Sequence, residues 1–353
     1  MANAESRITL LPHPRTLLAA AAILIAGHAA AQDLTIVTRG EALRVPMREV
    51  FLHPFTLSTD IPVRHEMWEG GIDVLRTQVK APDNAWDLVQ VDASELAVGC
   101  AEGLFEKLDW AAIGGKDHTM AAGVSDCGVG ALLSNMVLAW DRDKFPATPT
   151  WADFWDVAKY PGKRGLRQGV RGTLEIALLA DGVAPADIYK TLATNDGIDR
   201  AFRKLDQLKP YLVWWQTEAD AVRILGSGDV LMTSAPSGRV VTANRGEKRN
   251  FGIQWAASLY EVQSWAIVKG SQELRQAQQA LWFIGTTAIQ ARFLRLTGES
   301  GLARGINEGL PPEVAAISPT AQANIGAGMR VDTGFWNDNL AKLRQRFEAW
   351  QGR

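Results

Sequence analysis

The sequence has little cysteine, few histidines and no excess of charge of one sign. Its 353 residues include 2 cysteines and 5 histidines, and 37 basic against 39 acidic side chains give a net charge of −2. Two cysteines are too few for a disulfide framework or for a structural zinc site, which usually takes four ligands. Because there is no basic surplus of the kind that binds phosphate backbones, we expect no nucleic-acid partner. A hydrophobic content of 47% also excludes a disordered chain.

Catalytic motifs are missing as well. His53, His65 and His118 stand far apart, without acidic or cysteine partners at metal-ligand spacing. The glycine-containing strings lack the third glycine or the lysine of nucleotide-binding loops, and Ser300 does not have the glycines of a nucleophile elbow on both sides. We therefore predict that the protein is not an enzyme and has no metal or other cofactor. A secreted hydrolase is a remote alternative.

The N-terminus has the pattern of a signal peptide. Arg7 and Arg15 precede an apolar run at 17–27, which is followed by small residues at 29–31. The run is too short to span a bilayer, which takes roughly 20 residues. We predict cleavage after Ala31 and a periplasmic location. Since no cysteine stands near that position, we expect no lipid anchor.

Export changes how the two cysteines are interpreted. An oxidising compartment favours a disulfide bond, and Cys100 and Cys127 allow only one pairing within the chain. The alternative is two buried free thiols.

Strand and helix patterns alternate along the chain. Apolar strands are predicted at 34–37, 63–67 and 87–91, with helices from Pro46 and from Ile72 between them. This alternation implies an α/β fold with a mostly parallel sheet, helices on both faces and ligands at the carboxyl ends of strands. At roughly 150 residues per domain, the length suggests two domains. Further strands are predicted at 128–141, 211–215, 230–233, 251–255 and 263–268, a capping box at Thr150 and Asp153 predicts a helix from Trp151, and an amphipathic helix ends the chain.

Six segments in order along the chain form a recognisable set. They are LTIVTRGE (34–41), AWDLVQVD (85–92), EGLFEKLDW (102–110), TWADFWD (150–156), YPGKRGLR (160–167) and LYEVQSWAIVKGS (259–271). Together they resemble the spermidine/putrescine-type periplasmic solute-binding proteins of ABC importers. The resemblance implies a type II periplasmic binding protein, with two α/β lobes joined by two crossing segments and a ligand cleft between the lobes. It also implies a monomer that captures a small solute by hinge closure and delivers it to an inner-membrane ABC permease.

On this resemblance, residues 1–31 are the signal peptide. Lobe 1 then comprises 32–136 and 263–298, and lobe 2 comprises 137–262 and 299–353.

Several residues differ from those that the resemblance leads us to expect in a polyamine site. Arg39 stands where the polyamine binders have aromatic and hydroxyl residues, and Ser234 where they often have a tryptophan. Where relatives have two acidic residues, this chain has Glu261 and Gln263. Replacing a carboxylate by an amide removes a charge-assisted hydrogen bond of roughly 1.5–3 kcal/mol, and so favours a less cationic ligand. Glu299, near a tyrosine of the relatives, either replaces the missing charge or is a solvated loop residue.

The first expectation for the ligand is a small amine-bearing, polyamine-like solute. Asp92, Glu261 and Glu299 would hold its amines, and Gln263 and Trp336 would shape the pocket. Thirteen tryptophans are present, and most are expected in the core.

The alternative is a carboxylate or a zwitterionic, amino acid-like solute. Arg39 and Arg239 would hold its carboxylate bidentately, with Asp92 or Glu261 on its amine. Arg239 is equally a candidate for an ion pair with an acidic residue on its own lobe. The run of Arg164, Arg167 and Arg171 predicts a solvated face or a dock for the permease.

Overall fold

The structure is a computed structural model that describes Met1, residues 33–81 and residues 84–352. Apart from Met1, the predicted signal peptide lies outside the described residues. Among the helices of the described part, none has both the length and the apolar composition that a membrane span requires.

A mixed sheet organises residues 33–352. Its strand order is β2-β1-β3-β8-β4-β7-β5-β6, and β9 pairs with β8 beside this path. The strands are β1 (Leu34–Thr38), β2 (Val63–Met67), β3 (Leu88–Val91), β4 (Val129–Asp141), β5 (Arg164–Arg167), β6 (Leu212–Trp215), β7 (Met232–Pro236), β8 (Phe251–Ile267) and β9 (Met329–Arg330).

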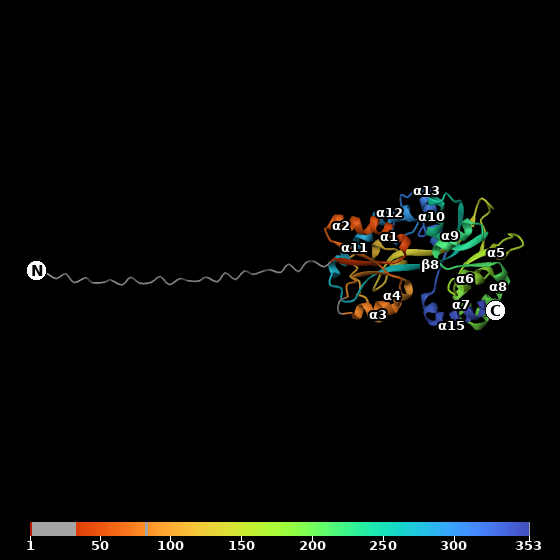
Figure 1. The fold of residues 1–353 in the computed structure, drawn as a ribbon, viewed down its shortest axis with the longest axis horizontal. Helices are drawn as coiled ribbons and strands as arrows, with labels where there is room; N and C mark the ends of the chain where they lie inside the picture. The colour runs from red at the N-terminus through yellow and green to blue at the C-terminus, as the bar shows by residue number, and fades with distance from the viewer. Residues whose placement is uncertain (2–32, 82–83, 353) are drawn as a thin grey trace. The chain divides into compact units, whose positions relative to one another are not determined.

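Two parallel strand groups flank a long antiparallel pair. β1 pairs in parallel with β2 and β3, and β5 pairs in parallel with β6 and β7. Between these groups lie β4 and β8, which pair antiparallel with each other; β8 also pairs with β3, and β4 with β7. Figure 1 shows β8 running between the two groups of helices that surround these strands. The long strands therefore join two α/β halves, as the predicted fold class requires.

Helices cover both faces of the two parallel groups. Residues 41–59 form an almost continuous helical segment, in which a 3₁₀ turn (Glu41–Leu43) and a π-helical turn (Arg48–Leu52) flank α1. The α-helices are α1 (Arg44–Met47), α2 (His53–Thr59), α3 (Ile72–Lys80), α4 (Ala93–Ala101), α5 (Trp151–Trp155), α6 (Thr173–Ala180), α7 (Ile188–Leu192), α8 (Asn195–Leu208), α9 (Glu218–Gly226), α10 (Ser237–Gly246), α11 (Leu274–Ile284), α12 (Thr287–Thr297), α13 (Pro312–Ala316), α14 (Gln322–Ala327) and α15 (Thr333–Gln351).

Each half has apolar clusters on both faces of its sheet. Because side chains alternate along a strand, Leu34 and Ile36 of β1 enter one cluster and Val37 enters another. In the second half, Leu138 and Trp140 of β4 enter a different cluster from Val137 and Ala139. The C-terminal helix α15 belongs to the second half, because its buried residues Trp336, Leu343, Phe347 and Trp350 share a cluster with α6 and α8.

The two long strands are interrupted where the halves meet. The pairing of β4 with β8 shifts between Met136 and Leu138, where Val137 stands opposite the four residues 255–258 of β8. Ala257 in this stretch has a positive φ of 54°. Such an irregularity bends a strand pair and increases its twist. It marks the point at which the chain passes from one half to the other.

Most of the predicted elements are confirmed. β1, β2 and β3 lie where the apolar patterns predict them, and the capping box of Thr150 and Asp153 starts α5. The predicted helix start at Pro46 is wrong, because helical turns already begin at Glu41. The two strands predicted at 251–255 and 263–268 are one strand, β8.

The structure has a disulfide bond between Cys100 and Cys127. Cys100 lies in α4 and Cys127 lies two residues before β4, with Cα atoms 5.8 Å apart. The bond links helix α4 of the first half to the start of β4.

Candidate ligand-binding cleft

A cavity of about 1060 Å³ lies where the two halves face each other across β4 and β8. Alternate residues of the two strands form its floor, because residues i and i+2 of a strand point to the same side. Loops at the carboxyl ends of β1, β3, β5 and β7 supply further lining residues. The floor residues are Leu132, Ser134, Met136, Leu259, Glu261 and Gln263.

Seven of the eight predicted binding residues line this cavity. They are Arg39, Asp92, Ser234, Arg239, Glu261, Gln263 and Glu299.

The prediction for Trp336 needs a correction. Trp336 is 1% exposed and packs in the cluster beneath α6 and α15, outside the cavity lining. Its indole Nε1 donates a hydrogen bond to Oε1 of Glu175 at 2.7 Å, and the Tyr189 hydroxyl donates to the same oxygen at 2.8 Å. Burial raises the pKa of Glu175. Trp336 therefore donates a hydrogen bond to the buried carboxyl group of Glu175 and does not shape the ligand pocket.

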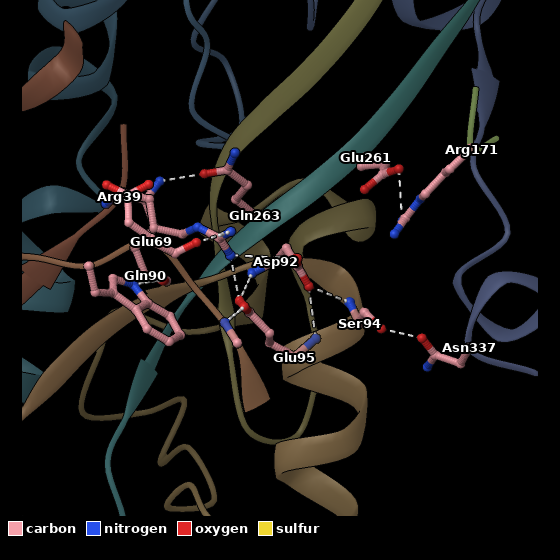
Figure 2. A network of polar contacts seen from close by, with 12 residues as sticks. Arg39, Glu69, Gln90, Asp92, Ser94, Glu95, Arg171, Glu261, Gln263 and Asn337 are labelled. Carbon is pink, nitrogen blue, oxygen red and sulfur yellow. Dashed lines mark hydrogen bonds and ion pairs between the residues drawn. The ribbon is translucent and has the colours of Figure 1, made fainter. Parts of the chain in front are cut away.

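Arg39 is held by acidic partners of its own half (Figure 2). Its Nη1 lies 2.5 Å from Oε2 of Glu95 and 3.5 Å from Oδ2 of Asp92. The guanidinium also lies over the Trp68 ring at 5.5 Å, and Nη2 donates to the carbonyl oxygen of Glu69 at 3.4 Å. These contacts engage most of the guanidinium, so little of it is left for a ligand carboxylate.

Asp92 is the N-cap of α4. Its Oδ1 accepts hydrogen bonds from the backbone N–H groups of Ser94 and Glu95, and the Glu95 carboxylate accepts one from the N–H of Asp92. This reciprocal arrangement is a capping box. Burial, and then the neighbouring Asp92, raise the pKa of Glu95. The carboxylate of Asp92 thus caps helix α4 and forms an ion pair with Arg39.

Gln263 is fixed from below by a second glutamine. The buried Gln90 donates from Nε2 to Oε1 of Gln263 at 2.6 Å, and its own Oε1 accepts from the backbone N–H of Arg39 at 3.2 Å. The amide at position 263 therefore links the first half to the floor of the cleft.

Arg171 and Glu261 form a second charged group in the cleft, separate from Arg39 in Figure 2. Arg171 Nη2 lies 2.8 Å from Oε1 of Glu261. Neither Nε nor Nη2 of Arg171 finds a hydrogen-bond acceptor with good geometry among the described residues, although both atoms are buried. Burial raises the pKa of Glu261, and Arg171 opposes that shift. The N–H groups on Nε and Nη2 of Arg171 are therefore available to donate hydrogen bonds to a ligand.

The arginine run is not a uniform solvated face. Arg164 is fully buried and donates to the carbonyl oxygens of Phe154 and Tyr160 at 2.6 Å each, and burial lowers its pKa to about 10. Arg167 is exposed and lines the cleft, as does Arg171. Arg171 lies in the loop between β5 and α6, flanked by Gly169 and Gly172. A cation in a glycine-rich loop at the carboxyl end of a strand is the sequence signal that points to Arg171.

The remaining charged group lies beside α10. Arg239 donates from Nε to Oε2 of Glu218 at 3.1 Å, so it forms the predicted ion pair on its own half. The Glu299 carboxylate lies against Gly238 in the first turn of α10. Burial, and then Glu218, raise the pKa of Glu299 to about 7. The Ser234 hydroxyl is buried in the same wall without a hydrogen-bond partner among the described residues.

A two-half fold with a polar cleft at its crossing strands is that of a binding protein for small solutes. The chain belongs to the bacterial extracellular solute-binding protein family, whose model matches residues 51–326. At the level of the family, such proteins are solute-binding components of ABC transporters and not enzymes.

Three relatives are similar over nearly the whole chain. The γ-aminobutyric acid (GABA)-binding protein of Pseudomonas aeruginosa PAO1 is 39% identical over 333 residues, which cover 94% of each chain. A solved ABC transporter substrate-binding protein from Bradyrhizobium japonicum USDA 110 is 29% identical, with a TM-score of 0.80 over 90% of this chain and 99% of that one. A solved GABA receptor is 27% identical, with a TM-score of 0.79 over 90% and 97%. The predicted family of extracellular solute-binding proteins is thus confirmed. Two of these three relatives are named for GABA, and none of the three is named for a polyamine.

Proposed function

We propose that this protein captures a zwitterionic, amino acid-like solute of the GABA type in the periplasm and delivers it to an inner-membrane ABC permease. The proposal takes up the second of the two ligand classes that the sequence left open. It is supported by the GABA-binding protein that is 39% identical over 94% of the chain.

The observation that carries the proposal is the guanidinium of Arg171 beside the carboxylate of Glu261 in the cleft. The buried Nε and Nη2 of Arg171 lack a well-aligned hydrogen-bond acceptor among the described residues, and Nη2 lies 2.8 Å from Oε1 of Glu261. A guanidinium fork binds a carboxylate bidentately, and each charge-assisted bond contributes about 1.5–3 kcal/mol. We therefore assign the ligand carboxylate to Arg171, whose Nε and Nη2 lack a well-aligned acceptor among the described residues, rather than to Arg39 or Arg239, which donate hydrogen bonds to Glu95 and Glu218.

A polyamine fits this cleft less well. Its ammonium groups would share the cavity with Arg167 and Arg171, and like charges in a partly buried site repel strongly. A zwitterion places one charge of each sign among lining groups that also have both signs.

Capture is proposed to occur by hinge closure. We take the bend between Met136 and Leu138 as the hinge about which the two halves move. The liganded monomer would be the form that the permease recognises.

Calorimetric titration of the purified protein tests the function. We expect binding of GABA and no comparable binding of putrescine or succinate. Arg171→Ala should weaken GABA binding by about 100-fold, and Arg171→Lys should recover only part of it, because a point charge lacks the fork geometry. Arg200→Ala is the matched control, since Arg200 pairs with Asp181 away from the cleft. Binding of putrescine in preference to GABA, or an unchanged affinity in Arg171→Ala, would refute the proposal.

A further inference from the structure

Glu299 is held in place by the end of α12. Gly298 adopts a positive φ of 76° and terminates the helix, and the N–H of Glu299 then donates to Oγ1 of Thr297 at 3.0 Å. The next residue, Ser300, accepts a hydrogen bond from the N–H of Leu133 in β4 at 2.9 Å. The backbone at Glu299 is therefore fixed on both sides, and its side chain lines the cleft.

The carboxylate of Glu299 has no hydrogen-bond donor among the residues that the structure describes. Arg239 acts on Glu299 through its charge, but its Nε already donates to Glu218. The Glu299 side chain is partly exposed to the cleft. A carboxylate that loses part of its water without gaining donors is destabilised, unless it is protonated or meets a cation. A ligand ammonium group would supply both the charge and the N–H donors.

The side chain of Glu299 fills the space beside Gly238. A Cβ atom at position 238 would collide with Oε1 of Glu299, so the carboxylate occupies the room that Gly238 leaves. Ser234 lines the same cavity with a buried hydroxyl that lacks a partner. An ammonium group has three N–H donors, and a carboxylate and a hydroxyl are suitable acceptors for them.

The strand register separates Glu299 from the Arg171 group. Ser134 of β4 pairs with Glu261 on one side, and Leu133 pairs with Ser300 on the other. Glu261 and Glu299 therefore flank β4, with their backbones about 10 Å apart, because neighbouring strands lie roughly 4.8 Å from each other. An α-amino acid places its two charges on one carbon and cannot span the width of a strand.

We infer that Glu299 receives the ammonium group of the ligand, and that its separation from Arg171 across β4 selects ω-amino acids over α-amino acids. The inference rests on the proposed function, and it assigns Glu261 to the positioning of Arg171. Glu299 becomes the residue that distinguishes a zwitterion from a simple carboxylate.

Proton-linked binding follows from this assignment. The charged groups that face Glu299 are Arg239 of α10 and Glu218 of α9, while α12 and β4 contribute the uncharged Thr297 and Ser134. The ionised carboxylate binds the ammonium, so a group with a pKa of about 7 must lose its proton on binding at lower pH. GABA itself keeps both charges in this range, since its groups resemble those of Glu and Lys, at about 4.3 and 10.4. Affinity for GABA should therefore rise as the pH increases from 6 to 8.

The decisive experiment compares Glu299→Gln with the wild type in titrations with GABA, butyrate and glycine at several pH values. In Glu299→Gln we expect GABA binding to weaken by about 10- to 100-fold and to lose its pH dependence, as for a lost charge-assisted bond. Butyrate, which lacks the ammonium group, should bind both proteins equally. Glycine should bind the wild type far more weakly than GABA. Glu247→Gln is the matched control, because Glu247 is exposed and pairs only with Arg249.

The outcomes separate the inference from the proposed function. If the wild type does not bind GABA, the proposed function fails. If it binds GABA and Glu299→Gln binds it equally well, or loses butyrate and GABA in the same proportion, the inference is overturned while the function stands. Equal binding of glycine and GABA would overturn the selection by length.

Discussion

At the scale of single residues, a glycine of the cleft determines where a charged side chain lies. Gly238 leaves the space that the Glu299 carboxylate fills. Gly238→Ala keeps every charge but puts a methyl group into that space, and only the flexible end of Glu299 has to move. We expect the variant to fold and to bind GABA about tenfold more weakly, as when one charge-assisted bond is misplaced.

Circular dichroism and titration of Gly238→Ala check this expectation. The double variant Gly238→Ala with Glu299→Gln should bind no more weakly than Glu299→Gln alone, because the methyl group then displaces a side chain that no longer holds the ligand. Additive losses would show that Gly238 acts through another contact.

Which residues reach the cleft could be predicted from the sequence, but not which of them are free to bind. Arg39 and Arg239 follow predicted elements, and both line the cavity. Their partners Glu95 and Glu218 lie 56 and 21 residues away in sequence, and only the folded chain brings them into contact. Arg171 was assigned to a surface because its neighbours are also basic. In the structure, Arg164 is buried instead of lying on a surface, and Arg171 lines the cleft.

At the scale of elements, the position of Asp92 is explained by its role as the N-cap of α4 better than by a contact with a ligand. Asp92→Ala removes the capping acceptor and should lower the free energy of unfolding by about 0.5–2 kcal/mol. Asp92→Asn keeps an acceptor oxygen and should retain most of that stability. Since the ammonium is assigned to Glu299, GABA affinity in Asp92→Asn should change by less than about threefold, as expected for a partly solvated charge.

Urea denaturation and titration measure the two quantities separately. Thr150→Ala in the capping box of α5 is the matched control, because it removes a similar cap far from the cleft. A loss of GABA affinity in Asp92→Asn larger than about tenfold, the size of a charge-assisted contact, would return Asp92 to the binding site.

The elements themselves were the most predictable part of the fold, and the exceptions have a common cause. Short buried strands such as β1 and β3 are continuous apolar runs and are easily recognised. β8 was divided because polar residues interrupt its apolar pattern, and two of them, Glu261 and Gln263, face the ligand cleft. The polar lining of the cleft thus interrupts the apolar pattern by which a strand is recognised.

At the scale of the whole molecule, a side-chain hydrogen bond between α4 and α15 links the first half to the second half. The Ser94 hydroxyl of α4 donates a hydrogen bond to Oδ1 of Asn337 in α15 (Figure 2). α4 packs on β8 and β3 of the first half, whereas α15 packs in the cluster of α6 and α8. If hinge closure accompanies capture, this contact exists in the closed form and is broken in the open one.

A bond that forms only on closure stabilises the liganded state and leaves the open state unchanged. Ser94→Ala and Asn337→Ala should therefore each raise the dissociation constant for GABA by about 2- to 12-fold, the range of a net hydrogen bond of 0.5–1.5 kcal/mol. The increase should appear in the dissociation rate, measured by stopped-flow fluorescence of the cleft tryptophan Trp68. Asn339→Ala, on the same helix but bonded within it, is the control. In the double variant the two losses should not add, because both remove the same bond. Additive losses, or an equal change in the stability of the ligand-free protein, would mean that the contact does not report closure.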